Sequence, residues 1–188
     1  GVVDILLGMA AAADEPIAGG RHKVFGHADL AVIPQTSTIA SHLPRAVGIA
    51  FAIDRAARLG VACTWPVDAV TVCTFGDASL NHATSQAALN TAAHCAYQRL
   101  PLPLLFVCED NGLGISVPSP VGWVEGVLRA RSQLRDARAD GDEPEAALAT
   151  ARELAAWVRE HRRPAVLHLH AVRYLAHAGA DVETVYRS

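Results

Sequence analysis

The stretch Ala69-Val70-Thr71-Val72-Cys73-Thr74-Phe75, followed directly by Gly76-Asp77-Ala78-Ser79, decides the fold of this chain. Its first seven residues are apolar or β-branched, which is typical of a buried strand, and the Gly-Asp pair ends the strand with a turn. The pattern returns at Leu104-Leu105-Phe106-Val107-Cys108, an apolar run that stops at Glu109-Asp110-Asn111-Gly112. Between the two runs, the alanine-rich residues 81–98 predict a helix. This alternation of strand, polar loop and helix predicts an α/β fold, a parallel sheet flanked by helices on both faces.

The remaining residues extend the same pattern. Residues 1–20 begin as an apolar, alanine-rich stretch, residues 21–41 have the composition of a loop, and a helix is predicted from Pro44 to Gly60. Further along, the sequence predicts helices over 123–135 and 142–161, a turn at 139–141 between them, and a third strand over 165–172. We interpret the charged segment 136–145 as a solvated connection.

Composition excludes several classes of protein. Hydrophobic residues make up 51% of the 188 residues and charged residues 19%, which excludes a disordered chain. A net charge of −3 and an aromatic content of 5% argue against nucleic-acid binding. The length predicts a single domain over residues 1–188. Because the chain starts at Gly1-Val2-Val3, we expect it to be a fragment of a longer polypeptide.

The four cysteines indicate the redox environment of the protein. Cys63, Cys73, Cys95 and Cys108 are widely spaced and contain no CxxC pair, so we expect reduced thiols and not a secreted disulfide scaffold. No apolar run reaches the roughly 18 residues of a membrane span. We therefore expect a cytoplasmic, bacterial protein that contacts neither membrane nor nucleic acid.

Polar side chains follow each of the three predicted strands. Asp77 comes after the first, Asp110 and Asn111 come after the second, and Arg173 and His177 come after the third. Parallel sheets bind ligands beyond the carboxyl ends of their strands, so these side chains are expected to meet at one edge. Carboxylate and amide oxygens are typical ligands of Mg²⁺ bound together with a phosphate, and an arginine suits the phosphate itself.

These residues carry a resemblance to thiamine diphosphate enzymes. Gly76-Asp77-Ala78-Ser79-Leu80-Asn81 followed by Glu109-Asp110-Asn111-Gly112 resembles their GDG and NN motif. Two further blocks, residues 37–48 and 172–188, make the chain similar to the alpha subunit of 2-oxo acid dehydrogenase components, closest to the branched-chain (2-oxoisovalerate) type. The resemblance spans nearly all of the chain and implies the diphosphate-binding domain of the thiamine diphosphate-binding fold.

The resemblance also implies roles for individual residues. Asp77 and Asn111 would ligate Mg²⁺ through their side chains, and Leu113 through its carbonyl oxygen. The residues implied to line the cofactor are Gly76, Ala78, Ser79 and Arg173 at the diphosphate, and Ser37 and Ile39 at its middle and aminopyrimidine side. His177 matches the active-site histidine that contacts the reacting intermediate or the lipoyl group.

Two positions depart from the family motif. Ala78 replaces the third glycine of GDG, which the backbone tolerates if its φ is negative. Asp110 replaces the first asparagine of the NN pair and adds a negative charge near the site. In the family that this chain resembles, the residue at that position usually faces the surrounding structure and not the metal.

Several residues leave alternatives open. His168 and His170 lie on one face of a strand as a possible metal pair, although we favour ordinary sheet histidines. Thr36, Thr38 and Ser41 match a K⁺ loop of some branched-chain relatives, and His42 is a candidate lining group. Asn81 is interpreted as a capping or loop residue and not as a ligand.

The implied reaction is oxidative decarboxylation of a 2-oxo acid, with transfer of the acyl group to the lipoyl group of an acyltransferase component. The glutamate that activates the cofactor would come from a beta subunit or a fused beta region, so the chain alone should be inactive. The assembly would be an α₂β₂ heterotetramer or a dimer of fused chains. The alternatives are another thiamine diphosphate enzyme, such as an acetoin dehydrogenase or a transketolase-like protein, and a non-catalytic assembly domain.

Overall fold

The computed structural model describes residues 1–21, 24–35 and 37–187. Their contacts divide the chain into two compact units, Gly1–His42 and Leu43–Ser188. Each unit is described by itself, and the prediction of a single domain over 1–188 stays a prediction. Among the described residues, no helix combines the length and the apolar character needed to cross a membrane.

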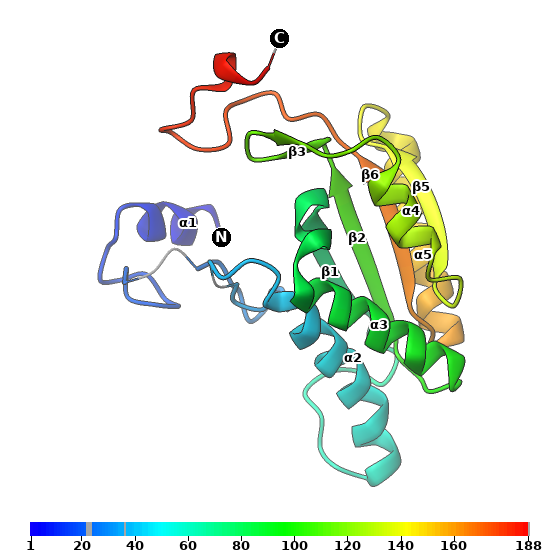
Figure 1. The fold of residues 1–188 in the computed structure, drawn as a ribbon. Helices are drawn as coiled ribbons and strands as arrows, with labels where there is room; N and C mark the ends of the chain where they lie inside the picture. The colour runs from blue at the N-terminus through cyan, green and yellow to red at the C-terminus, as the bar shows by residue number, and fades with distance from the viewer. Residues whose placement is uncertain (22–23, 36, 188) are drawn as a thin grey trace. The chain divides into compact units, whose positions relative to one another are not determined.

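The first unit contains one helix, α1 (Val2–Met9), and extended loops (Figure 1). An isolated bridge joins His27 to Val32. The buried carboxylate of Glu15 accepts hydrogen bonds from the backbone N–H groups of Ile17 and Ala18 at 2.8 and 2.5 Å. These donors, that of Ala18 first, lower the pKa of Glu15. Local hydrogen bonds thus organise the turn that follows Glu15.

The second unit is built on a four-stranded parallel sheet in the order β1-β2-β6-β5 (Figure 1). The strands are β1 (Thr71–Gly76), β2 (Leu104–Asp110), β6 (Ala165–His170) and β5 (Arg135–Asp140). Gly76 lies opposite Glu109, and Asp110 lies opposite His170. The carboxyl ends of β1, β2 and β6 therefore meet at one edge, which confirms the predicted parallel α/β fold.

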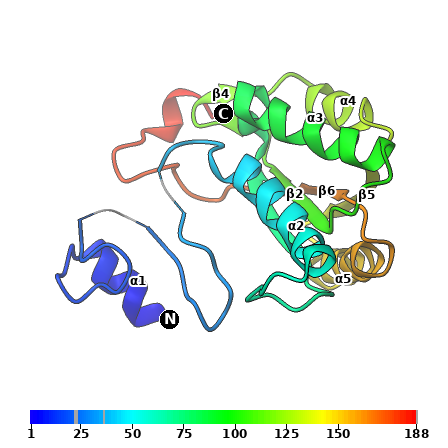
Figure 2. The same cartoon turned by 90° about the horizontal axis from the view of Figure 1, so that it is seen from below.

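Helices pack on both faces of this sheet. The longer ones are α2 (His42–Leu59), α3 (Ala83–Tyr97), α4 (Trp123–Arg129) and α5 (Pro144–His161). Figure 2 shows α3 and α4 on one face and α5 on the other. On the α5 face, Leu154 and Val158 pack against Leu105, Ala165 and Leu167 of the central strands. The short elements are η1 (Asp77–Asn81), β3 (Leu113–Gly114), β4 (Val117–Pro118) and η2 (Glu183–Val185).

The strand β5 corrects two predictions. The helix predicted over 123–135 ends at Arg129, and the segment interpreted as a solvated connection holds the edge strand Arg135–Asp140. Ala137 and Ala139 of this strand pack against the core, and the charged residues alternate with them. An edge strand needs only one apolar face, and two alanines give that face a weak sequence signal.

The helix predicted over 81–98 is also shorter than expected. A separate 3₁₀ turn, η1, carries Asp77 to Asn81, and α3 then starts after His82. The His82 ring caps α3 by accepting the Thr84 N–H at 3.1 Å. The break gives Asp77 a position in a tight turn directly beyond β1.

Candidate functional site

The two motif halves lie next to each other at the carboxyl edge of the sheet. Asp77 directly follows Gly76, the last residue of β1. Gly76 is paired with Glu109 of β2, and Asp110 and Asn111 come directly after Glu109. The Cys108 thiol lies close enough to both halves for their charges to affect it: burial raises its pKa most, and the charges of Asp110 and Asp77 raise it further. Residues 34 positions apart in sequence are therefore brought to one place, as the strand-end argument predicted.

Ser119 joins the two halves. Its hydroxyl donates a hydrogen bond to Oδ2 of Asp77, and its backbone N–H donates to the Gly112 carbonyl at 2.8 Å. The sequence analysis missed this residue. Ser119 stands between two prolines in a loop, and no spacing or motif in the sequence singles it out.

Asp77 has the environment of a cation ligand. Its residue surface is 2% exposed, and the Ser119 hydroxyl is its hydrogen-bond donor. Among residues 43–187, the described part of the same unit, no Arg or His forms an ion pair with it. A buried carboxylate without a compensating positive charge is costly. A hard divalent cation would supply that charge and takes oxygen ligands of this kind.

The loop after β2 presents two further oxygens. Oδ1 of Asn111 accepts the Leu113 N–H at 3.0 Å, and Gly112 between them has a φ of +71°, which suits glycine. β3 pairs with β4 in an antiparallel hairpin that places Leu113 opposite Pro118. Because the Ser119 N–H donates to the Gly112 carbonyl, the next pair, Leu113 and Pro118, is a non-hydrogen-bonded pair of the ladder, and the Leu113 carbonyl takes no bond from β4. This is the carbonyl implied as a metal ligand.

The hairpin lies directly on η1. A Cβ built on Gly114 would sit 2.8 Å from Cβ of Ala78, closer than side chains approach in proteins. The methyl of Ala78, which stands at the third position of the GDG-like motif, therefore fits because position 114 is glycine. The contact places the hairpin that follows the second half of the motif against the turn that carries the first half.

Arg173 reaches the same hairpin from the segment after β6. Its Nη1 donates to the Ile115 carbonyl at 2.7 Å, and its Nη2 donates to the Tyr186 hydroxyl at 2.6 Å. Its Nε is buried and, among the described residues, has no hydrogen-bond partner. A buried donor without an acceptor suits an anionic ligand, which is the role the resemblance implies.

The segment around His177 is held by Asp181. The Asp181 carboxylate accepts the Tyr186 hydroxyl and, at 2.7 Å, the His177 backbone N–H. These two donors, that of Tyr186 first, lower the pKa of Asp181. Burial first, and then the bond to Asp181, raise the pKa of Tyr186. His177 itself is exposed, and its proposed contact with substrate stays a prediction.

The remaining predicted cofactor residues belong to the first unit. Ser37 and Ile39 lie in the loop before α2, and Ile39 is 62% exposed. Their part in the site stays a prediction. Of the K⁺ loop, Ser41 donates its hydroxyl to the Thr38 carbonyl at 2.9 Å, whereas Thr36 lies outside the described residues.

The structure favours sheet roles for His168 and His170. Nε2 of His168 lies 2.7 Å from Oδ2 of Asp110, and Nδ1 of His170 lies 3.6 Å from Oδ1 of Asp140. In the part of the chain that the structure describes, no three His, Cys, Asp or Glu side chains are grouped as a metal centre. Both histidines are thus paired with carboxylates of the sheet.

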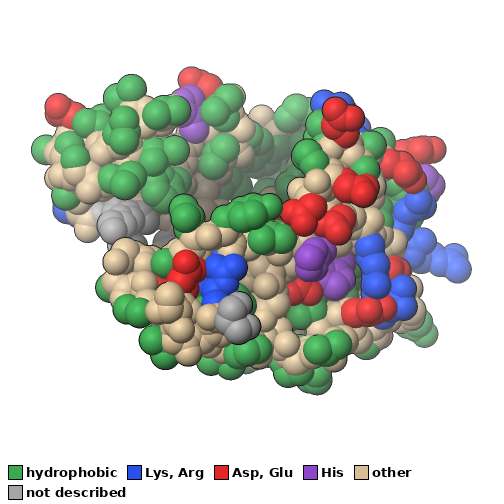
Figure 3. All heavy atoms as spheres, turned by 90° about the horizontal axis from the view of Figure 1, so that it is seen from above, with side chains coloured by type: hydrophobic (Ala, Val, Ile, Leu, Met, Phe, Trp, Pro, Cys, Tyr) green, Lys and Arg blue, Asp and Glu red, His purple; other side chains and the backbone are tan. Residues whose placement is uncertain are grey.

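Seen from the end to which the strands point, charged side chains are concentrated on the side that carries α4, β5 and β6 (Figure 3).

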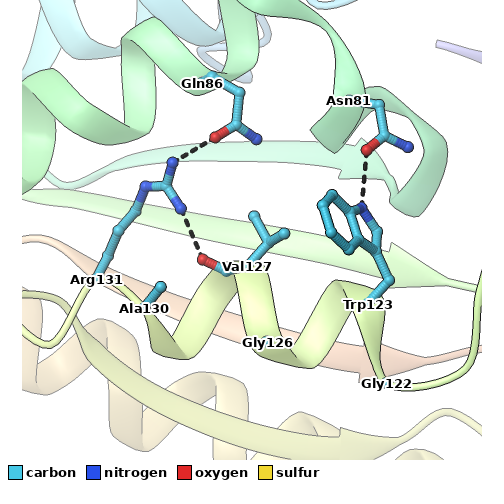
Figure 4. A pocket seen from close by; sticks show the side chains of 8 residues that line it. All are labelled: Asn81, Gln86, Gly122, Trp123, Gly126, Val127, Ala130 and Arg131. Carbon is cyan, nitrogen blue, oxygen red and sulfur yellow. Dashed lines mark hydrogen bonds between the residues drawn. The ribbon is translucent and has the colours of Figure 1, made fainter.

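Asn81 faces a different pocket. A cavity of about 450 Å³ lies between the start of α3 and α4, and Asn81 accepts the Trp123 indole N–H there at 2.8 Å (Figure 4). Arg131 lines the same pocket and donates to the Val127 carbonyl at 2.6 Å and to the Gln86 side chain. The Asn81 oxygen is thus occupied by a loop hydrogen bond, which fits the interpretation of Asn81 as a structural residue.

In fold, the second unit has the parallel α/β architecture with a polar edge that ligand-binding α/β proteins share. A transketolase mutant from Pichia stipitis is similar to the chain with a TM-score of 0.54, over 74% of this chain and 20% of that one, at 19% identity. At this identity the likeness concerns the fold alone.

The family follows from sequence comparison. The model of the dehydrogenase E1 component matches residues 1–188, so the chain belongs to this family. Among its relatives, 2-oxoisovalerate dehydrogenase subunit alpha 2 of Arabidopsis thaliana is 33% identical over 87% of this chain and 32% of its own length. The human mitochondrial alpha subunit is 26% identical over 81% of the chain and 32% of its own length. The alpha subunit of Bacillus subtilis is 26% identical over 98% of the chain and 53% of its own length. The chain thus spans about a third to a half of these relatives, and the family predicted from the motifs is confirmed.

Proposed function

We propose that this chain forms the diphosphate-binding half of the active site of a 2-oxo acid dehydrogenase that uses thiamine diphosphate and Mg²⁺. The observation that carries the proposal is the buried carboxylate of Asp77 beside the Asn111 loop, which has no ion-pair partner among residues 43–187. Membership of the E1 family and the similarity to 2-oxoisovalerate dehydrogenase alpha subunits support it. A branched 2-oxo acid is the substrate class we propose.

The residues at the sheet edge would divide the binding work. Asp77 and Asn111 would hold Mg²⁺ through their side-chain oxygens, and Leu113 would add its carbonyl. Arg173 would give its buried Nε–H to the diphosphate. The diphosphate would be lined further by Gly76, Ala78 and Ser79, and the cofactor by Ser37 and Ile39. Bound thiamine diphosphate supplies the electron sink for loss of CO₂ from a 2-oxo acid, and the protein supplies position and charge.

The remaining functions belong to partners. We propose that a beta subunit or beta region supplies the activating glutamate, and that a lipoyl-bearing acyltransferase component accepts the acyl group. His177 lies in an exposed segment, where an incoming lipoyl group has access to it. We place the whole assembly in the bacterial cytoplasm.

Calorimetric binding of thiamine diphosphate to the full-length protein with its beta partner tests the proposal. Titrations with Mg²⁺, with EDTA and with Asp77→Ala should show binding in the first case alone. Asp136→Ala is the matched control, because Asp136 is an exposed carboxylate on β5. Binding that ignores both metal and Asp77 would refute the assigned site, and no binding at all would favour the non-catalytic assembly domain.

Decarboxylation of branched 2-oxo acids with an artificial electron acceptor then tests the reaction. The proposal expects turnover by the assembled protein and none by the chain alone. Normal turnover by the isolated chain would contradict the division of the active site between two chains. Turnover of acetoin or a sugar phosphate in place of a 2-oxo acid would show one of the other thiamine diphosphate activities.

A further inference from the structure

Asp110 connects β6 to the loop of the proposed metal site. Its Oδ2 lies 2.7 Å from Nε2 of His168, and its Oδ1 accepts the Gly112 backbone N–H at 3.0 Å. The two side chains are 17% and 18% exposed. One carboxylate thus contacts a strand of the sheet with one oxygen and the turn that contains Asn111 with the other.

Strand register explains why these side chains meet. His168 on β6 lies opposite Cys108 on β2, and Asp110 is two residues further along β2. Residues two apart in a strand point to the same face, so His168 and Asp110 are diagonal neighbours on one face of the sheet. The contact follows from the pairing of two central strands and does not depend on a loop.

A second pair of charges supports His168 from the other side. Arg138 on β5 lies opposite His168, and its guanidinium contacts Glu125 of α4. The hydrogen bond from Arg138 is the main cause that lowers the pKa of Glu125, and a positive charge on His168 would add to it. His168 thus lies beside Asp110 of β2 and opposite Arg138 of β5, which pairs with Glu125.

We propose that Asp110 and His168 form a positioning pair for the metal-binding loop. The hydrogen bond from His168 fixes the Asp110 carboxylate, Asp110 fixes the Gly112 turn, and this turn presents Asn111 and the Leu113 carbonyl. The proposal rests on the function proposed for Asp77 and Asn111. Neither residue is among the proposed metal ligands, so both would act through the loop.

Loss of the pair should weaken metal binding. Without the His168 donor, Oδ2 of Asp110 is a part-buried acceptor that has lost its partner, and the carboxylate is free to turn away from Gly112. Groups that orient metal ligands typically change metal affinity by about 10–100-fold when they are removed. We expect a loss in this range.

Two amide substitutions separate geometry from simple loss of polarity. The amide of His168→Gln reaches the place of Nε2 and keeps the donor to Asp110, whereas that of His168→Asn is too short to reach it. The probe is Mn²⁺, measured by electron paramagnetic resonance on the full-length protein with its beta partner and thiamine diphosphate. His168→Asn should bind Mn²⁺ about 10–100-fold more weakly, and His168→Gln should bind it within a few-fold of the unchanged protein.

Two further variants complete the test. Asp110→Asn added to His168→Asn should recover most of the affinity, because a neutral amide no longer leaves an unpaired charge. His170→Asn is the matched control and should bind like the unchanged protein, since its side chain is 62% exposed and pairs with Asp140.

The outcomes distinguish the pair from the site itself. If Asp77→Ala abolishes Mn²⁺ binding but His168→Asn does not weaken it, the positioning pair is overturned and the metal site stands. Equal losses in His168→Asn and His168→Gln would also overturn the pair, because one of them keeps the donor. If the unchanged protein binds no Mn²⁺, the proposed function fails, and the pair fails with it.

Discussion

The contact between Gly114 and Ala78 gives a prediction that depends on a single methyl group. In Gly114→Ala the new Cβ would lie 2.8 Å from Cβ of Ala78, whereas ordinary van der Waals contact begins at 3.4 Å. The β3–β4 hairpin would have to move away from η1 by about 0.6 Å to restore that distance. Ser119, which hydrogen-bonds to Asp77 and to Gly112, would be displaced with it.

The cost of this change follows from overpacking. Added methyl groups in packed sites typically cost about 1–3 kcal/mol, and the lower end applies here because Ala78 is exposed on its other side. About 1 kcal/mol lowers the melting temperature of a region of this size by about 2–4 °C. The strained hairpin also carries the Leu113 carbonyl, so we expect weaker Mg²⁺ binding in the same variant.

A double-mutant cycle isolates the contact. Thermal unfolding of the full-length protein is compared for Gly114→Ala, Ala78→Gly and the double variant. Removing the Ala78 methyl makes room for the new one, so the double variant should recover about 1 kcal/mol relative to the sum of the two single effects. Additive effects, within about 0.3 kcal/mol, would refute the reasoning, because they would show that the two positions do not touch.

Three further predictions concern other parts of the chain. Hydrogen bonds from Tyr186 and His177 hold the pKa of Asp181 below its ordinary value of 3.8. The ionised Asp181 carboxylate should therefore order residues 171–187 fully above pH 3.8, and this order should be lost as the pH falls through the lowered pKa of Asp181. Asp181→Asn should bring the same loss at neutral pH, seen as faster tryptic cleavage within 171–187; equal cleavage would contradict it. Asn81→Ala should leave Mg²⁺ affinity unchanged in calorimetry, because the Asn81 oxygen bonds an indole and not the metal; a tenfold loss would make Asn81 a ligand. Cys63 is exposed, whereas burial raises the pKa of Cys73 to about 12, so at pH about 8 a thiol reagent should label Cys63 quickly and Cys73 only on unfolding; early labelling of Cys73 would contradict its burial.

The parallel sheet could be predicted because its buried central strands are unbroken apolar runs in the sequence. An unbroken apolar run such as Leu104–Cys108 fits a strand covered on both faces and needs no knowledge of its neighbours. The edge strand Arg135–Asp140 could not be read in this way. Its only apolar side chains, those of Ala137 and Ala139, are half-buried, and pairing with β6 decides its conformation. The same reasoning explains why the sequence predicts a helix up to residue 135 although α4 ends at Arg129: no local residue between 129 and 135 marks the end of a helix.

In the candidate site, too, some residues could be predicted from the sequence and others could not. That Asp77 and Asn111 would share one edge follows from the topology rule for parallel sheets, because both stand at strand ends. The contacts of Ser119 and His168 follow from a hairpin conformation and from the register of β2 on β6. Register is a property of two segments together, and a single sequence without that pairing contains no signal for it.

The two departures from the family motif each have a structural counterpart on a neighbouring element. Ala78 adds a methyl where the motif has glycine, and Gly114 leaves room for that methyl on the facing hairpin. Asp110 adds a charge where the motif has asparagine, and His168 provides its hydrogen-bond partner on the next strand. Both departures from the motif are therefore accommodated by a residue on a neighbouring element of the fold.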